Sequence, residues 1–303
     1  YDIHERLVGS EMCIRDRYYT DAAGNKVLSG EKMMIGALVC SIGAVICYML
    51  CYHMTTERVK VEQNTQKFSF KELISEIAHN KALIGIIVCA LLFLLAQLSL
   101  SNMNNYIYPN YFGNVSAMSL ANLAGMVVIL VLSTFIVKLS AKVGKKELSV
   151  IGSIISAAAF LILFFIHTDN VWVWIVLVLI SSVGTAMFNM VIWAMITDVI
   201  DDSEVRTGVR QDGTIYSVYS FARKLGQACS SGISGVLLSI IGYTAATAHD
   251  PKVVDGIYNV TCLVPALGMI LLFLALQFLY PLNKKRVEEN AKILKERREA
   301  KVQ

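Results

Sequence analysis

Apolar residues are grouped in long runs along most of the chain, and short polar segments separate these runs. A helix needs about 20 mostly apolar residues to cross a hydrocarbon core of about 30 Å. The runs contain glycine and lack the period-2 alternation of a barrel strand. The pattern therefore predicts an all-α membrane protein with about seven transmembrane helices, at about 33–54, 82–101, 117–138, 148–167, 171–197, 214–241 and 261–281.

Lys and Arg residues are distributed unevenly between successive connections. Basic residues near the ends of membrane spans are retained on the cytoplasmic side. Three connections and the C-terminal tail are basic: 55–81, 138–147, 198–213 and 283–303. The alternate connections contain one lysine in all, Lys252: 102–116, 168–170 and 242–260. This alternation places the N-terminus outside and the C-terminus in the cytoplasm.

The composition agrees with a membrane protein, because 55% of the residues are apolar and only 17% are charged, whereas soluble domains have about 25% charged residues. The first segment, YDIHERLVGSEMCIRDR, has no initial Met and no apolar core of a signal peptide. We interpret residues 1–17 as an adaptor-like segment that is not native to the protein.

The segment DDSEVRTGVRQD, 201–212, concentrates charge between two apolar runs, and FARKLGQA places Arg223 and Lys224 inside the second of them. The longer stretch WAMITDVIDDSEVRTGVRQDGTIYSVYSFARKLGQA, 193–228, resembles the signature between helices ten and eleven of the glycoside, pentoside and hexuronide cation symporters of the major facilitator superfamily. The matching positions are Asp198, Asp201, Glu204, Thr207, Gly208, Val209, Arg210, Tyr216, Ser217 and Lys224. A second stretch, AKVGKK at 141–146, is similar to the basic loop between helices eight and nine of that family.

The resemblance implies a twelve-helix fold in two halves, of which this chain would supply helices six to twelve as a C-terminal fragment. It divides the chain into an outer loop plus sixth helix, a central cytoplasmic loop, a C-terminal six-helix half and a basic cytoplasmic tail: 18–54, 55–81, 82–282 and 283–303. The implied function is cation-coupled symport of a glycoside, pentoside or hexuronide by alternating access in a bacterial plasma membrane. The implied partners are the sugar, the lipid bilayer, the missing N-terminal half, and a sodium ion or proton bound in that half; no cofactor and no nucleic acid is expected.

A seven-helix receptor shares the predicted topology and is the main alternative. However, no Asp/Glu-Arg-Tyr closes the third run, no Asn-Pro-x-x-Tyr closes the seventh, and the outer connections lack a Cys pair. No enzyme is predicted, because the His residues are scattered and no Gly-rich phosphate loop, nucleophile elbow or HExxH motif occurs. The Cys residues form no CxxC pair, so no metal site is predicted.

Lys224 is the first candidate for a substrate-binding residue. If its helix starts near Thr214, a rise of about 1.5 Å per residue puts Lys224 about 15 Å into the membrane, where a charge is costly and marks a transport pathway. The resemblance implies the same, because the lysine of helix eleven in that family lines the sugar cavity and links it to the cation site. The alternative is that the apolar part begins after Lys224 and that both basic heads extend to the cytoplasmic surface.

Other polar residues complete the predicted sugar site, which needs many hydrogen-bonding groups to replace the hydration of the sugar. The helix of Lys224 offers Tyr219, Ser220 and Gln227. Asn189, in the preceding helix, is either a substrate ligand or part of an interhelical hydrogen bond. The stretch SNMNNYIYPNYFGN, 101–114, either lines the outer mouth of the sugar path or forms an interfacial aromatic belt.

The charged connection 198–213 is predicted to hold a cytoplasmic gate. The resemblance implies that its gate residues pair with charges of the other half when the transporter faces outward: Asp198, Asp201, Glu204 and Arg210. A surface salt bridge contributes only about 0–1 kcal/mol to stability. However, a free-energy difference of that size changes the relative populations of two nearly equal states several-fold. The alternative is that all six charges of 201–212 belong to a solvated turn.

Overall fold

The computed structural model describes residues 18–20, 26–28, 30–55, 80–210, 212–244, 247–248 and 250–302. The adaptor-like segment 1–17 and nearly all of the predicted central loop 55–81 lie outside the described residues. The chain divides into two compact units, Tyr1–Lys67 and Phe68–Gln303.

The first unit contains a short hairpin and one long helix. Strands β1, Tyr18–Thr20, and β2, Lys26–Leu28, pair antiparallel, a feature that the hydrophobic pattern did not predict. Helix α2, Gly30–Met54, is apolar around its whole circumference, and its large side chains from Met34 to Met54 are exposed. A helix of this kind is long and apolar enough to cross a membrane.

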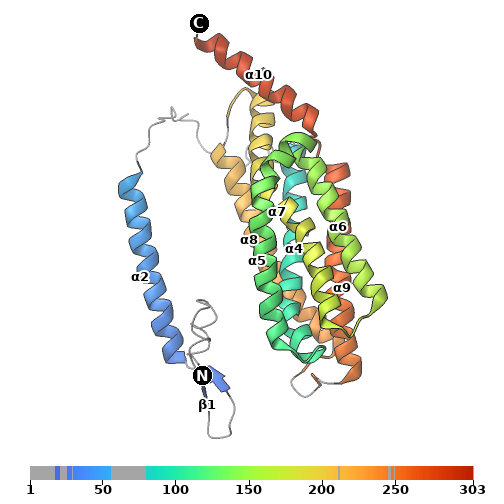
Figure 1. Ribbon diagram of the computed structural model, residues 1–303. Helices are drawn as coiled ribbons and strands as arrows, with labels where there is room; N and C mark the ends of the chain where they lie inside the picture. The colour runs from blue at the N-terminus through green and yellow to red at the C-terminus, as the bar shows by residue number, and fades with distance from the viewer. Residues whose placement is uncertain are drawn as a thin grey trace. The chain divides into compact units, whose positions relative to one another are not determined.

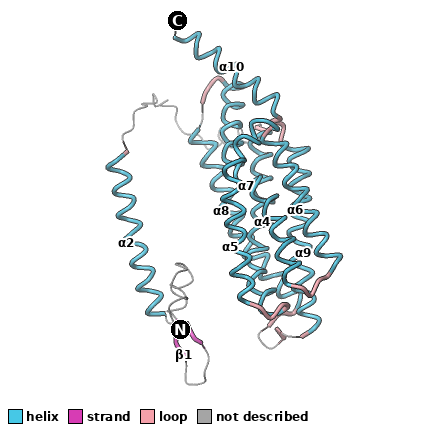
Figure 2. Tube along the Cα trace, viewed as in Figure 1, coloured by secondary structure: helices cyan, strands magenta, loops and turns pink. Residues whose placement is uncertain are grey.

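The second unit is a bundle of long helices (Figures 1 and 2). Its elements are α4, Lys81–Asn110; α5, Val115–Val143; α6, Lys145–Ile166; α7, Val171–Thr207; α8, Asp212–Ile241; α9, Pro251–Leu274; the π-helical turn η1, Ala275–Leu279, which continues α9; and α10, Lys284–Val302. Helix α6 packs against α7 and α9, helix α4 packs against α8 and α9, and α5 packs against α7.

Asparagine side chains begin three of these helices. The side-chain oxygens of Asn80, Asn114 and Asn170 accept hydrogen bonds from the first free backbone N–H groups of α4, α5 and α7, which have no partner within the helix. Helix α7 ends at Thr207 and is capped by Gly208, whose φ of 77° is accessible to glycine at little cost. Pro251 opens α9 at a position where its missing N–H is not needed.

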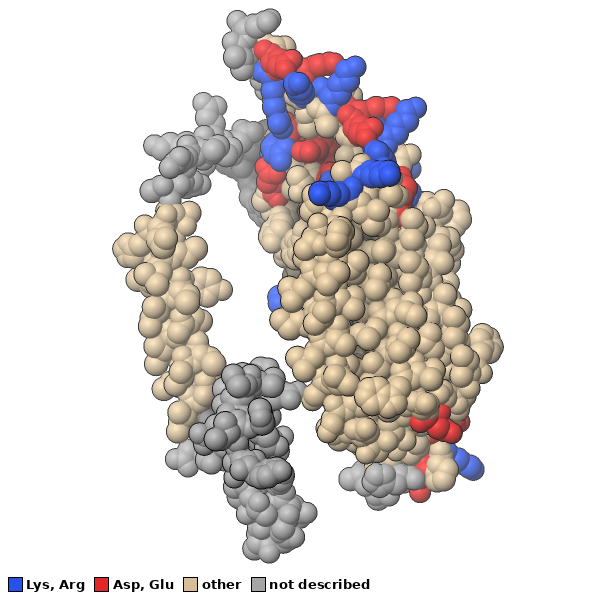
Figure 3. All heavy atoms as spheres, viewed as in Figure 1, with Lys and Arg blue, Asp and Glu red and all other residues tan. Residues whose placement is uncertain are grey.

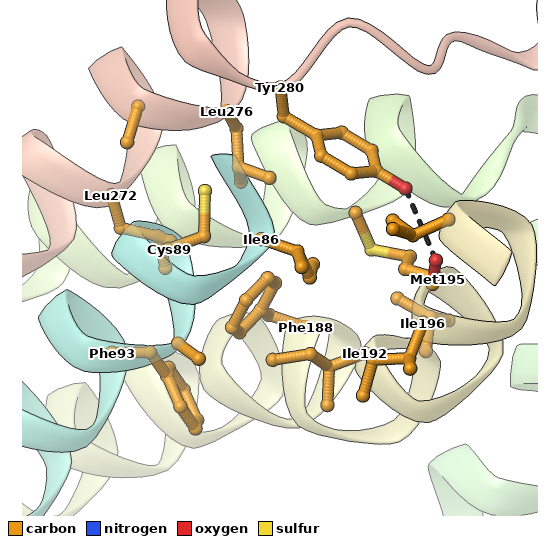
Figure 4. Close-up of a cluster of buried hydrophobic side chains, with 14 of the residues drawn as sticks. Ile86, Cys89, Phe93, Phe188, Ile192, Met195, Ile196, Leu272, Leu276 and Tyr280 are labelled. Carbon is orange, nitrogen blue, oxygen red and sulfur yellow. Dashed lines mark hydrogen bonds between the residues drawn. The ribbon is translucent and has the colours of Figure 1, made fainter. Parts of the chain in front are cut away.

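Buried side chains from α4, α7, α9 and η1 form the core of the end of the bundle at which α4 begins (Figure 4). Phe93 and Phe188 meet edge to face with ring centroids 4.9 Å apart. The buried hydroxyl of Tyr280 donates to the carbonyl of Met195 at 3.4 Å, as Figure 4 shows. This packing fixes α7 against α4 and therefore fixes the polar faces that these two helices present elsewhere.

The prediction of an all-α membrane protein with seven spans is confirmed, because seven helices of the described residues are long and apolar enough to cross a membrane. Four predicted connections are wrong in extent. Helix α4 continues to Asn110, within 102–116, and only Gly144 separates α5 from α6, within 138–147. Helix α7 continues ten residues beyond 197, to Thr207, so that most of 198–213 is helical. Helix α9 begins at Pro251, within the predicted connection 242–260. Both helices project past the apolar segment that the hydropathy marks.

Charged side chains of the second unit gather at one end of the bundle. In the face that Figure 3 shows, acidic and basic residues cover α10 and the adjoining helix ends. Beyond them lies a broad surface nearly free of charged side chains, which reappear in small number at the opposite end. The end at α10 brings together the start of α6, the end of α7 and the whole of α10, which are joined by ion pairs. An uncharged belt next to a charged end is the surface that a lipid bilayer requires.

Candidate functional site

A polar cavity of about 210 Å³ lies among α4, α5 and α7, and residues of α6 and α9 complete its lining. We call it the amide cavity; its polar lining consists of Gln97, Ser101, Asn104, Asn122, Ser181, Ser182, Thr185 and Asn189. Phe160, Pro265 and Met269 supply part of its apolar wall. Ligand pockets commonly enclose about 300–1,000 Å³, so this cavity has the size of part of a site.

The spacing of the polar residues explains why they share one cavity. Gln97, Ser101 and Asn104 follow one another at i, i+4 and i+7, and therefore lie on one face of α4. Ser182, Thr185 and Asn189 follow one another at i, i+3 and i+7, and lie on one face of α7. A polar stripe along an apolar span faces away from lipid, since its groups cannot be hydrated there.

The amide groups of the cavity keep their hydrogen-bonding capacity for a ligand. Ser182 and Thr185 already donate to carbonyls of their own helix, at 2.9 and 3.1 Å. By contrast, among the described residues the side chains of Gln97, Asn122 and Asn189 make no hydrogen bond, and the buried Oδ1 of Asn104 has no partner. Each amide offers both donors and acceptors. The cavity therefore suits a small, neutral, hydroxyl-rich molecule.

Of the five predicted substrate residues, only Asn189 lines the amide cavity. The other four lie on α8: Tyr219, Ser220, Lys224 and Gln227. The ring of Tyr219 is fully buried, and Ser220 is partly buried. Lys224 is exposed and its Nζ donates to Oε1 of Gln227 at 3.3 Å. Gln227 lies further from the charged start of α8 than Lys224 does, so in this structure the ammonium group of Lys224 points away from that charged end.

A second cluster, which the sequence did not predict, joins α7 to α8. We call it the cation-aromatic cluster; its members are Trp193, Tyr216, Tyr219 and Arg223. The Arg223 guanidinium carbon lies 4.9 Å from the Trp193 ring centroid, and its Nη1 donates to the Tyr219 hydroxyl at 3.1 Å. Trp193 follows Asn189 by four residues, so it continues the stripe of α7 that lines the amide cavity.

The predicted gate residues are paired within this unit. Lys145 Nζ lies 2.6 Å from Oδ1 of the buried Asp198, across the α6–α7 contact. Arg210 Nη1 lies 2.8 Å from both Asp201 Oδ1 and Glu204 Oε2. Burial lowers the pKa of Arg210, but hydrogen bonds to Glu204, Asp201 and Asp212 outweigh this effect and raise that pKa above its ordinary value. The guanidinium therefore stays charged in this arrangement.

Asp202 lies in the same segment but was not among the predicted gate residues. Its carboxylate is almost fully buried and lies 3.2 Å from Arg286 Nη2, while the amide of Asn290 donates to it at 3.1 Å. Arg206, one turn away, lies 3.1 Å from its other oxygen. The alternative that all charges of 201–212 form a solvated turn is therefore wrong for Asp202. This residue anchors α10 to the end of α7.

The Lys145–Asp198 pair predicts unequal effects of its two single substitutions. Lys145→Ala should destabilise the folded protein by about 2 kcal/mol, because it leaves the buried Asp198 carboxylate unpaired. Asp198→Asn should cost about 1 kcal/mol or less, since Lys145 is partly exposed and an amide still accepts its hydrogen bond. Thermal melting of the purified protein measures both, with the exposed Lys138→Ala as the control. Equal losses in the two variants would contradict the burial argument.

Within the described residues, no group of three His, Cys, Asp or Glu side chains is arranged to hold a metal ion. The six cysteines among them are free thiols. The two described polar sites therefore offer amides, hydroxyls, aromatic rings and guanidinium or ammonium groups, which bind ligands by hydrogen bonds, stacking and charge.

Several known proteins are similar to this chain in sequence. The chain is 31% identical over 255 residues to a protein named an uncharacterised symporter of Bacillus subtilis, covering 84% of this chain and 55% of that protein. It is 30% identical over 259 residues to the glucuronide carrier protein homolog of Escherichia coli, covering 83% and 55%. It is 24% identical over 280 residues to the isoprimeverose transporter of Lactiplantibacillus pentosus, covering 88% and 58%. The chain thus spans a little over half the length of these relatives.

These relatives are named as a symporter, a carrier and a transporter, which agrees with the prediction that the chain is not an enzyme. The sequence profile described as MFS/sugar transport protein matches residues 22–284, which is most of the chain. This match excludes the seven-helix receptor that remained as an alternative. The chain therefore belongs to the MFS/sugar transport protein family, a multi-pass membrane family of the major facilitator superfamily.

Proposed function

We propose that the complete protein is a secondary active transporter that carries a sugar by alternating access, and that this chain supplies one half of it. The amide cavity is the observation that carries the proposal: it presents unpaired amides on α4, α5 and α7 and no charged residue among its described lining. A sugar ring needs many neutral donors and acceptors in place of water. The small volume supports a site that a second group of helices completes.

The orientation and the membrane are part of the same proposal. We place the charged end, with α10, in the cytoplasm of a bacterial cell, and the start of α4 at the same side, because Lys and Arg are retained inside. The short connection between α6 and α7 then faces outward. The N-terminus lies outside and the C-terminus inside the plasma membrane.

Coupling to a sodium ion or a proton belongs to the proposal as well. The resemblance implies a cation site built of acidic residues, and the described lining of the amide cavity contains no carboxylate. We therefore place the cation site in the other half of the transporter. The resemblance further implies that Lys224 on α8 links the sugar cavity to that cation site.

Uptake of labelled sugars by the complete protein tests the function. Cells or proteoliposomes should accumulate at least one glycoside, pentoside or hexuronide above its external concentration when a sodium or proton gradient is present, and should only equilibrate it after the gradient is dissipated. Residues 18–303 alone should not transport, because alternating access moves two halves around a shared site. Accumulation of none of the three sugar classes, with the protein folded in the membrane, would contradict the proposal.

The predicted gate implies that a substitution in it changes how accessible the inner cavity is to a labelling reagent. We propose that Asp198, Asp201, Glu204 and Arg210 exchange their present partners for charges of the other half when the transporter faces outward. Arg210→Gln should then weaken the outward-facing state, because it removes the positive charge that pairs with the other half in that state. Labelling of a single cysteine in the inner cavity of a cysteine-free protein should rise several-fold, with sugar affinity nearly unchanged. Equal labelling before and after the substitution would remove the gate.

A further inference from the structure

Arg223 is a charged side chain inside a membrane span. It lies eleven residues from the start of α8 at Asp212 and eighteen from its end at Ile241, or about 16 and 27 Å along the helix. A guanidinium within a membrane span is costly unless it is paired or faces a water-filled path. Among the described residues, no ion pair involves Arg223.

The neighbours of Arg223 hold it in place without neutralising it. The guanidinium stacks on the Trp193 ring and donates one hydrogen bond to the Tyr219 hydroxyl. Stacking on an aromatic face compensates part of the lost hydration, and a hydroxyl leaves the positive charge intact. A guanidinium has five donors in a planar fork, so most of them remain available for an anion.

The cation-aromatic cluster adjoins the amide cavity. Trp193 lies one turn from Asn189 on the same stripe of α7, about 6 Å further along the helix. On α8, Tyr216, Ser220, Arg223 and Gln227 recur at i, i+4, i+7 and i+11, and form the stripe that meets Trp193. Trp193 and Tyr216 are 45% and 50% exposed, so their rings are open to a ligand.

We propose that Arg223 binds the acidic group of the transported sugar, so that the substrate class is an acidic sugar, with a carboxylate or sulfonate at one end of the ring. This inference rests on the proposed function. The amides of the cavity then bind the hydroxyl groups, Trp193 or Tyr216 stacks on the apolar face of the ring, and Arg223 forms a forked, charge-assisted pair with the acid. The alternative partner of Arg223 is a carboxylate of the other half of the protein.

Matched pairs of sugars distinguish these two partners. In the complete transporter, uptake of methyl β-glucuronide, its galacturonide analogue and a methyl 6-sulfo-6-deoxyglucoside is compared with uptake of the neutral methyl β-glucoside and galactoside. The wild type should prefer at least one acidic member to its neutral counterpart. Arg223→Gln should lower kcat/KM for that acidic sugar by about 10- to 100-fold, as expected for the loss of a charge-assisted hydrogen bond. The neutral counterpart should change by less than about twofold.

Two controls interpret this result. Arg223→Lys keeps the charge but loses the planar fork, and should retain the acidic preference at reduced affinity. Thermal melting of Arg223→Gln checks that the protein remains folded. A wild type that transports only neutral sugars, or an Arg223→Gln variant that loses acidic and neutral sugars equally, overturns the inference and leaves the transporter function in place. A wild type that takes up neither class, nor any pentoside, overturns the proposed function itself.

Discussion

Lys224→Ala is expected to abolish active accumulation of every sugar that the complete protein carries, while the protein still inserts in the membrane. Lys224 is exposed on α8, lies within the span and donates to Gln227. No ion pair among the described residues involves it, so its loss removes no packing on which this unit depends. An ammonium group at this depth contributes to the transport path rather than to the fold.

The measurement compares accumulation of labelled sugar with the amount of protein in the membrane. Lys252→Ala is the matched control, because Lys252 is an exposed cation at the start of α9, outside the apolar belt. This control should accumulate sugar like the wild type. Wild-type accumulation by Lys224→Ala would show that the lysine is dispensable and would remove it from the site.

Gly184→Leu is expected to have the largest effect on stability. Helices α6 and α7 approach most closely where Gly152 and Gly184 face each other: a Cβ on Gly184 would collide with the carbonyl oxygen of Gly152 and lie 2.9 Å from the backbone nitrogen of Ser156. A backbone atom cannot rotate away as a side chain can. A leucine therefore has to separate the two helices, at a cost of about 3 kcal/mol, and it also displaces the stripe of Ser182, Thr185 and Asn189.

Size-exclusion chromatography and thermal melting in detergent measure this effect. The matched control is Gly232→Leu, because a Cβ on Gly232 has no neighbour within 4 Å in this unit. The control should elute and melt like the wild type, whereas Gly184→Leu should aggregate or melt at a clearly lower temperature. A Gly184→Leu variant that melts like the wild type would contradict the close approach of α6 and α7.

The number and the kind of helices were predictable because length and hydropathy decide them. Each span must be a run of about 20 apolar residues, and every such run of this chain can be recognised in its sequence. The ends were less predictable for a physical reason. Hydropathy marks where lipid ends, whereas a helix ends where its last carbonyls find other partners. Helix α7 therefore continues through Asp198 and Asp202 to Thr207, since Lys145 and Arg286 stabilise its charged turns.

The candidate site was predictable only in part. Asn189 was selected because an amide is rare in an apolar span, and the same argument applied to Gln97, Asn104 and Asn122 would have located the rest of the amide cavity. The i, i+4, i+7 spacing of the polar residues on α4 was the signal available. No spacing in the sequence indicated the contact between Trp193 and Arg223, because this contact depends on how α7 packs against α8.

Protection of the amide cavity by bound sugar against chemical labelling tests directly whether α4, α5 and α7 hold the sugar site. In a cysteine-free form of the complete protein, Thr185→Cys places a small thiol in the cavity lining, and Lys252→Cys places one at the exposed start of α9. A membrane-impermeant maleimide is added with and without a saturating transported sugar. Bound sugar should slow labelling of the thiol at position 185 by at least about tenfold and should leave labelling of the thiol at position 252 unchanged. Equal labelling at 185 with and without sugar would contradict the claim that α4, α5 and α7 hold the sugar site.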